Sequence, residues 1–185
     1  MSEREPILAA VGVRKRFGAL AVLDGVDFRL QAGEAVGIVG PNGAGKTTLL
    51  NVLAGSLRAT EGTIRFRGSD ISRASSARRC ALGIGRAHQI PRPFGGMTVF
   101  ENLFVGAATG GRRRGQQAYD RCIDALERCD LVDVANRRAE SLGLLHRKRL
   151  ELARALATGP TVLLLDEIGG GLTDAEASEL VATIA

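Results

Sequence analysis

The octapeptide GPNGAGKT, from Gly40 to Thr47, decides the fold class of this 185-residue chain. It matches the pattern G-x-x-x-x-G-K-[ST], follows the apolar run EAVGIVG (34–40) and opens the helical run KTTLLNVLAG (46–55). Glycines let main-chain N–H groups converge on phosphate oxygens, and a helix N-terminus adds partial positive charge at the same point. The sequence therefore predicts a phosphate-binding loop between a buried strand and a helix.

This loop supplies the first group of predicted site residues. Lys46 is expected to reach the β- and γ-phosphates of a nucleotide, and the Thr47 hydroxyl to ligate Mg²⁺. An accidental glycine turn is the alternative, and the strand–turn–helix context argues against it. The residues predicted to contact the nucleotide here are Gly40, Pro41, Asn42, Gly43, Ala44, Gly45, Lys46, Thr47 and Thr48.

A second group of predicted site residues follows the apolar run VLLL (162–165). Asp166 is expected to complete the shell of the Mg²⁺ ion, and Glu167 is placed to polarise an attacking water. An acidic pair after an apolar strand also fits a solvated strand end. The phosphate loop upstream favours the catalytic interpretation.

The strand patterns predict an α/β fold. Runs rich in β-favouring residues at 7–17 and 26–30 indicate antiparallel strands near the N-terminus, and GTIRFRG (62–68) alternates as an edge strand does. The runs at 34–40 and 162–165 are short, apolar and rich in branched residues, as buried strands of a mainly parallel core sheet are.

The region from 96 to 156 is helical in character, apart from the polar linker GGRRRG (110–115). We therefore expect a single domain with a core at 1–88 and 158–185. A mostly helical insert interrupts this core at about 89–157.

Composition narrows the function classes. The chain is 45% hydrophobic and 24% charged, which is typical of a globular protein, and it has no apolar run long enough to span a bilayer. Cys80, Cys122 and Cys129 form no CxxC pair, so we expect neither a disulfide framework nor a zinc site, and we expect a reducing, cytosolic location. The net charge of +5 fits nucleic acid, anionic lipid, phosphorylated ligands or a solvated Arg-rich surface, but only 4% of residues are aromatic, which argues against base stacking.

Two further stretches carry a family resemblance. Together with the two motifs above, GRAHQIPRPFGGMTVFENL (85–103) and RLELARALATGP (149–160) resemble the ATP-binding subunits of ABC transporters. The nearest likeness is to the branched-chain amino acid uptake group, and it covers essentially the whole chain. The resemblance implies an ABC-type P-loop NTPase that binds and hydrolyses Mg-ATP to energise an importer. It also implies a second ABC ATPase subunit and integral permease subunits as partners, with the chain held at the inner face of the cell membrane, and no nucleic acid.

Individual residues carry over from this family to positions of the present chain. Phe17 matches the aromatic residue that stacks on adenine, although a Phe at a strand end can also be an ordinary core residue. Gln89 matches the glutamine that joins the core to the helical insert and senses Mg²⁺ and the γ-phosphate. The resemblance thus makes Glu167, Gln89 and Lys46 catalytic, and Thr47, Gln89 and Asp166 metal-binding. The segment 97–103 falls where such subunits touch their permease, and amphipathic packing within the insert accounts for it equally well.

The turn before the helix RLELARAL departs from the family pattern L-S-G-G-Q. Leu142, Gly143, Leu144, Leu145 and His146 occupy those five places. Gly143 lacks the hydroxyl that serine offers to the γ-phosphate of the partner's ATP, and Leu145 brings a branched side chain near it. The helix dipole at Gly143 would still attract phosphate. A tolerated variant of the motif is the alternative, and His146 fits a cap or surface residue as well as a phosphate contact.

Other departures lie near the C-terminus. Ile168 replaces the usual proline, and Thr173 replaces Asp or Asn but begins TDAE (173–176), a capping-box pattern. The next helix places Leu180, Val181 and Ile184 on one face, which in the family is covered by a further strand that ends in a histidine. The resemblance implies that about a quarter of the family's length is missing, so we expect a truncated gene or a fragment with compromised stability.

Two alternative functions remain at this point. The altered turn and the missing strand are typical of a hydrolysis-deficient remnant that binds ATP and stabilises a partner. The positive charge fits an ABC-type ATPase that acts on nucleic acid.

Overall fold

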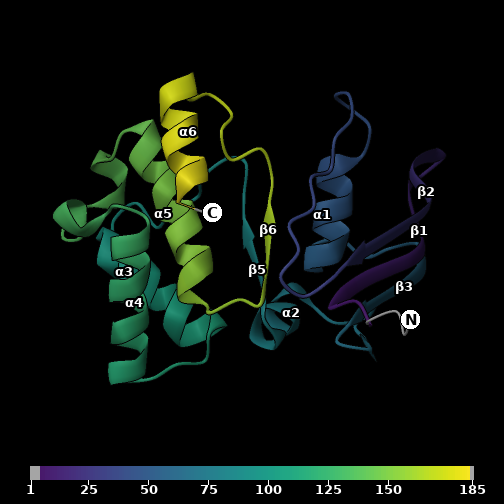
Figure 1. The fold of residues 1–185 in the computed structure, drawn as a ribbon, viewed down its shortest axis with the longest axis horizontal. Helices are drawn as coiled ribbons and strands as arrows, with labels where there is room; N and C mark the ends of the chain where they lie inside the picture. The colour runs from purple at the N-terminus through teal and green to yellow at the C-terminus, as the bar shows by residue number, and fades with distance from the viewer. Residues whose placement is uncertain (1–4, 184–185) are drawn as a thin grey trace. The chain divides into compact units, whose positions relative to one another are not determined.

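The computed structural model describes residues 5–183 (Figure 1). Packing divides the chain into two compact units, Met1–Arg79 and Cys80–Ala185, which we describe separately. The short helix α2 (Ser76–Leu82), which the sequence did not predict, crosses the boundary between them. The expected single domain with an insert at about 89–157 stays a prediction.

The first unit is built on a four-stranded antiparallel sheet. Its strands are β1 (Leu8–Phe17), β2 (Leu20–Leu30), β3 (Glu61–Phe66) and the two-residue β4 (Ser69–Asp70), in the order β2-β1-β3-β4. The antiparallel pair predicted at the N-terminus is therefore confirmed. The prediction of an edge strand for 62–68 is wrong, because β3 is hydrogen-bonded to β1 on one side and to β4 on the other.

The helix α1 (Lys46–Ala54) supplies the apolar side chains of the first unit together with this sheet. Leu49, Leu50, Val52 and Leu53 of α1 are buried, as are Leu8, Val13, Ile64 and Phe66 of the strands. Burial of one such side chain stabilises the folded state by about 1.5–3 kcal/mol. Gly55 ends α1 in the left-handed conformation (φ 79°), which is common for a glycine at a helix C-terminus.

The run before the phosphate loop differs from its prediction. Residues 34–40 form no regular secondary structure, and the side chains of Val36 and Val39 are 44% and 93% exposed. The prediction of a buried strand here is wrong. Apolar, branched residues favour an extended chain locally, but a strand also needs a hydrogen-bonded neighbour, and no described strand of the first unit pairs with this segment.

The second unit combines one parallel strand pair with helices. The strands β5 (Ile84–Ala87) and β6 (Val162–Leu165) pair in register from Ile84 with Val162 to Ala87 with Leu165. Among the described residues the parallel sheet consists of this one pair, so the sheet structure is mixed rather than mainly parallel as predicted, because residues 34–40 add no strand. The helices that the sequence predicts are present: α3 (Val99–Val105), which continues into a π-helical turn at Gly106–Gly110, α4 (Gln116–Arg128), α5 (Leu144–Ala157) and α6 (Asp174–Ala182).

The helices of the second unit share one apolar core. Leu103, Leu126, Leu150 and Leu180 are almost completely buried in it. The prediction that Leu180 and Val181 share one face of α6 is wrong, because Leu180 is 0% exposed and Val181 is 56% exposed. Ile184, the third residue of that predicted face, lies outside the described residues. The core also contains Cys122 and Cys129, whose thiols are free, as is that of Cys80.

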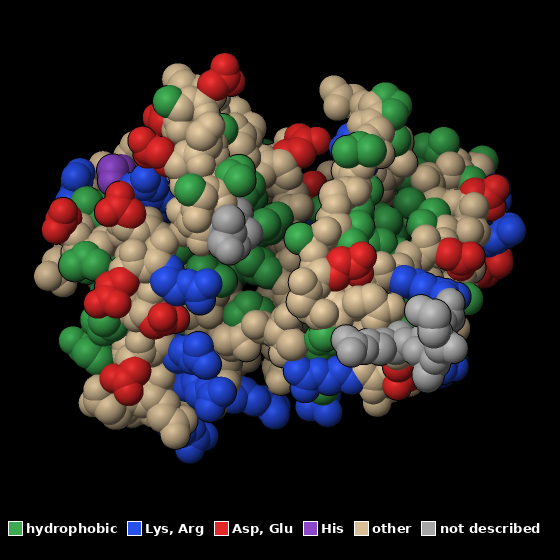
Figure 2. Space-filling model, viewed as in Figure 1, with side chains coloured by type: hydrophobic (Ala, Val, Ile, Leu, Met, Phe, Trp, Pro, Cys, Tyr) green, Lys and Arg blue, Asp and Glu red, His purple; other side chains and the backbone are tan. Residues whose placement is uncertain are grey.

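The surface of the second unit carries charges of both signs. Basic side chains (Lys and Arg) gather at its lower end in the view of Figure 2. In the linker before α4, Arg112, Arg113 and Arg114 are exposed. Asp120 and Asp124 of α4 lie beside Arg113 and Arg121 around a shallow pocket. Between residues 5 and 183, no helix is both long and apolar enough to cross a membrane.

Candidate functional site

The phosphate loop has a conformation that depends on two glycines. Gly43 (φ 83°) and Gly45 (φ 90°) lie in the left-handed region, which other residues rarely adopt. At Gly45 there is also no space for a side chain, because a Cβ atom would lie 3.0 Å from the carbonyl oxygen of Val22 and 3.1 Å from a methyl carbon of Leu23. The close approach of this loop to β2 therefore explains the second glycine of the motif.

The charge at this loop fits an anionic ligand. Helix α1 begins at Lys46, its N-cap Gly45 offers no side-chain cap, and its first turn contains no acidic residue. The partial positive charge of the helix N-terminus is therefore not offset by a neighbouring carboxylate. The Lys46 ammonium lies over the same loop, where it donates hydrogen bonds to the carbonyl oxygens of Gly40 (2.7 Å) and Pro41 (3.0 Å).

The other predicted residues of the loop are accessible. Thr48 is half-buried in the first turn of α1, and Gly40, Pro41, Asn42, Ala44 and Thr47 are exposed. A glycine loop, a lysine and an uncapped helix N-terminus together have the donor set that a nucleotide polyphosphate requires. These residues fit the predicted group.

The carboxylates predicted at the end of β6 lie in the second unit, where the structure brings Gln89 and Glu167 together. The side-chain amide of Gln89 donates a hydrogen bond of 2.6 Å to the carboxylate of Glu167. Glu167 is exposed and has a positive φ of 44°, which is uncommon for a residue with a Cβ atom. Asp166, next to it, is 3% exposed. One oxygen of the Glu167 carboxylate is thus fixed by an amide, while the group stays open to water.

Arg86 is a residue of this region that sequence reasoning missed. Its guanidinium donates to Oδ2 of Asp166 at 3.2 Å, and the two side chains are only 9% and 4% exposed. The pairing follows from the parallel register, since Arg86 on β5 lies opposite Leu164 and Asp166 follows β6 directly. The signal in the sequence was a basic residue inside a short apolar strand, where a charge needs a partner.

The altered turn before α5 keeps the geometry of a helix start. Gly143 is the N-cap of α5 with ordinary dihedral angles (φ −67°, ψ 170°), no side-chain cap and no atom within 4 Å of the position of a Cβ. Leu144 is 46% exposed, whereas Leu145 and His146 are half-buried. The exposed helix N-terminus is therefore present, but it has no hydroxyl group at Gly143.

The remaining predicted residues have clear environments. Phe17 is 48% exposed, with the Lys15 ammonium 4.9 Å from its ring centre, so it is not an ordinary core residue. The capping box at Thr173 is confirmed, because Thr173 and Glu176 bond reciprocally at the start of α6. In the segment 97–103, Val99 and Leu103 pack in the core, while Met97 is 39% exposed.

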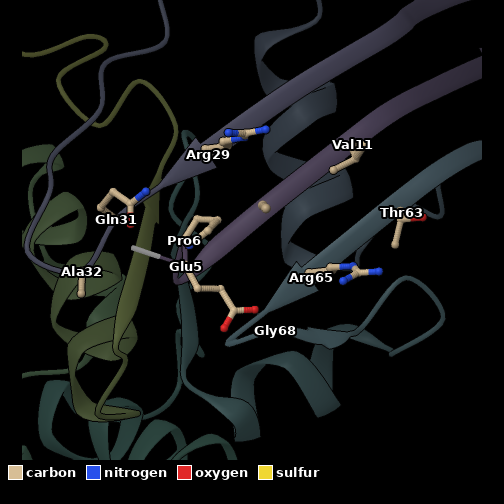
Figure 3. A pocket seen from close by; sticks show the side chains of 10 residues that line it. Glu5, Pro6, Val11, Arg29, Gln31, Ala32, Thr63, Arg65 and Gly68 are labelled. Atoms are coloured by element: carbon tan, nitrogen blue, oxygen red, sulfur yellow. The ribbon is translucent and has the colours of Figure 1, made fainter. Parts of the chain in front are cut away.

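A separate groove lies on the sheet of the first unit (Figure 3). It has a volume of about 970 Å³, and its lining includes Arg29 and Arg65 but none of the predicted site residues. Its shape follows from the register, because Ala9 on β1 pairs with Arg29 on β2 and with Arg65 on β3. A small side chain between two long ones leaves a hollow, so this groove is a consequence of the strand pairing.

Comparison with known proteins gives consistent matches over nearly the whole chain. The profile of the ABC transporter family matches residues 23–169. The high-affinity branched-chain amino acid transport ATP-binding protein LivG of Escherichia coli strain K12 is 38% identical over 195 residues, which cover 98% of this chain and 76% of that protein. A probable LivG of Methanocaldococcus jannaschii is 32% identical and covers 97% of this chain and 75% of its own length.

Solved structures agree with these relatives. A nucleotide-free ATP-binding cassette from an ABC transporter superimposes with a TM-score of 0.87 at 31% identity, covering 97% of this chain and 76% of that one. The ADP conformation of an ATP-binding cassette of an ABC transporter superimposes with a TM-score of 0.85, also at 31% identity, covering 97% of this chain and 75% of that one. The predicted fold of an ABC-type P-loop NTPase is thereby confirmed.

Proposed function

Because this chain belongs to the ABC transporter family, whose ATP-binding subunits hydrolyse ATP, we propose that it binds and hydrolyses Mg-ATP to energise an importer. The proposed solute is a branched-chain amino acid or a similar polar molecule, as the names of the relatives at 38% identity suggest. The observation that carries the proposal is the hydrogen bond of 2.6 Å between Gln89 and Glu167. This hydrogen bond fixes the solvent-accessible carboxylate of Glu167, which follows Asp166 just after the end of β6.

Each part of the site has a proposed role. The loop from Gly40 to Thr48 holds the phosphates through its main-chain N–H groups and Lys46, and Phe17 stacks on the adenine. Thr47, Asp166 and Gln89 would each be a ligand of Mg²⁺, and Mg-ATP, when bound, would supply an electrophilic γ-phosphate. Glu167 orients the attacking water by accepting a hydrogen bond from it. The Gln89 amide fixes the orientation of the Glu167 carboxylate.

The proposed partners are a second ABC ATPase subunit and permease subunits in the membrane. Gly143 and the N-terminus of α5 face the nucleotide of the second subunit in this proposal, and the exposed side of the segment 97–103 meets the permease. The chain then lies at the inner face of the cell membrane and acts as one ABC ATPase domain.

The test measures Mg-ATP binding and turnover by the 185-residue chain. Wild type is expected to bind Mg-ATP, Lys46→Ala to lose binding, and Glu167→Gln to keep binding while turnover falls by about 10²–10⁴-fold. If Lys46→Ala binds Mg-ATP as tightly as wild type, the proposal is wrong.

A binding-only role is the second candidate. It is favoured by the turn at Gly143, which offers no hydroxyl to the partner's nucleotide. Turnover by the purified chain that Glu167→Gln abolishes would exclude this candidate.

A further inference from the structure

Helix α5 carries a row of charged residues that is largely buried. Lys148, Glu151 and Arg154 follow one another at intervals of three residues, so they lie along one side of the helix. Lys148 is 5% exposed and Glu151 is 6% exposed, while Arg154 is half-buried. Charged residues this far from water need strong hydrogen-bonding partners. We call these three residues the α5 ladder.

The partners of the α5 ladder are main-chain atoms of the loop that carries Gln89. Lys148 donates to the carbonyl oxygen of Gln89 at 2.7 Å. The two oxygens of Glu151 accept the N–H groups of His88 and Arg92, each at 3.4 Å. Arg154 donates to the carbonyl oxygen of Arg92 at 2.9 Å and to Glu151 at 3.2 Å. The loop is therefore held through four main-chain atoms of His88, Gln89 and Arg92.

The far end of the loop is fixed as well. The guanidinium of Arg154 lies 5.1 Å from the centre of the Phe94 ring. The fully buried Asn102 of α3 accepts the N–H of Phe94 at 2.8 Å and donates to its carbonyl oxygen at 3.1 Å. The loop between His88 and Phe94 thus takes its position from helices rather than from an apolar core.

The α5 ladder contacts only the main chain of Gln89, so the side-chain amide of Gln89 can bind another residue. The α5 ladder binds the carbonyl oxygen of Gln89, so its amide remains directed at Glu167, 2.6 Å away. A shift of α5 along its axis would move the Gln89 main chain with it, and would lengthen or tilt the bond to Glu167.

We propose that Lys148, Glu151 and Arg154 are positioning residues that lock the Gln89 loop to α5, so that movement of the turn at Gly143 changes the contact between Gln89 and Glu167. The loop-locking part of this inference stands on the contacts alone, whereas its consequence for hydrolysis rests on the proposed function. The α5 ladder then links the partner's nucleotide, at the start of α5, with the water-orienting carboxylate of this chain.

The first experiment measures amide hydrogen exchange in the full chain without nucleotide. Glu151→Ala is expected to raise the exchange rates of the His88 and Arg92 amides about tenfold or more, because each loses a charged acceptor. Glu151→Gln, which keeps one acceptor oxygen, should restore part of the protection. Arg149→Met is the matched control. Arg149 is equally buried on α5 but bonds Asp130 (2.6 Å) and Glu179 (3.0 Å), so its loss should leave the loop 88–94 protected.

The second experiment separates kcat from KM for Mg-ATP in Lys148→Met. The variant should bind ATP without Mg²⁺ as wild type does, because the phosphate loop is untouched, and it should lose about tenfold in kcat with Mg-ATP, because Gln89 is released. Unchanged exchange at His88 and Arg92 in Glu151→Ala, or equal acceleration there in Arg149→Met, would overturn the locking. Unchanged kcat in Lys148→Met would overturn the link to Glu167. Failure of wild type to bind Mg-ATP would defeat the proposed function, while the exchange result would still decide whether the loop is locked.

Discussion

Replacing Gly143 by serine tests whether the altered turn limits hydrolysis. The structure accepts the substitution, because φ and ψ at this N-cap are −67° and 170° and no atom lies within 4 Å of the new Cβ. A serine in this conformation accepts an N–H of the first turn, and relative to glycine this stabilises the helix by a few tenths of a kcal/mol. For a chain of this size we therefore expect the Tm to rise by about 1 °C.

The effect on turnover should be larger than the effect on stability. A hydroxyl that reaches a charged phosphate oxygen in the partner's site contributes about 1.5–3 kcal/mol, which corresponds to roughly 10- to 100-fold in rate. Thermal unfolding and steady-state Mg-ATP turnover at several protein concentrations measure the two effects, since the proposed role of this turn requires a dimer. Gly96→Ser is the matched control, because Gly96 also has ordinary φ and open space at its Cβ but lies outside α5.

The outcomes distinguish the two interpretations of the turn. A raised Tm with unchanged turnover would refute the reasoning that the missing hydroxyl limits hydrolysis, and would make the turn a tolerated variant. A fall in Tm would refute the geometric argument itself, since it would mean that the space seen around Gly143 does not exist.

Three further predictions concern folding and reactivity. Gly45→Ala should weaken Mg-ATP binding at least tenfold, as measured by calorimetry, and lower the free energy of unfolding by about 1–3 kcal/mol, as measured by urea unfolding. The reason is that the alanine Cβ would lie 3.0 Å from the Val22 carbonyl oxygen, in a backbone conformation with φ at 90°. Arg79→Met should lower the free energy of unfolding by about 3 kcal/mol, because the buried guanidinium bonds the carbonyls of Val52, Leu53 and Ile71 at 2.7–2.8 Å, and Arg79→Lys should recover only part of it. Burial raises the pKa of the Cys129 thiol to about 12, so iodoacetamide at pH 8 should label the half-buried Cys80 well before Cys129. Mass spectrometry measures the labelling of each cysteine, and equal labelling would contradict the packing.

Features encoded in neighbouring residues could be predicted from the sequence. The phosphate loop depends on the spacing of Gly40, Gly45, Lys46 and Thr47, and the geometry of Gly45 explains why that spacing is needed. The capping box at Thr173 likewise involves residues three apart. In both cases the contacts that stabilise the conformation are local, so the pattern contains all the information required.

Features that depend on distant partners could not be predicted in the same way. The run 34–40 has the composition of a buried strand, but strand formation depends on a neighbour that the run itself does not specify. Arg86 was missed because its partner, Asp166, is 80 residues away. The α5 ladder was missed because its partners are main-chain atoms 59 to 63 residues away. Main-chain atoms are the same in almost every residue, so the sequence does not indicate which of them a side chain binds.

The contacts of α5 explain why a displacement of its first turn can also displace the Gln89 loop. Apolar residues such as Leu150 and Leu152 fix one side of the helix in the core of the second unit, and the α5 ladder fixes another side to the Gln89 loop. Arg149 holds the helix to Glu179 of α6 as well. A helix held on three sides by close packing and charged hydrogen bonds moves as one body rather than bending. The exposed turn at Gly143 and Lys148, whose ammonium binds the Gln89 carbonyl, therefore lie near each other at the N-terminal end of one rigid element, so a ligand that shifts α5 at the turn also shifts the contact with Gln89.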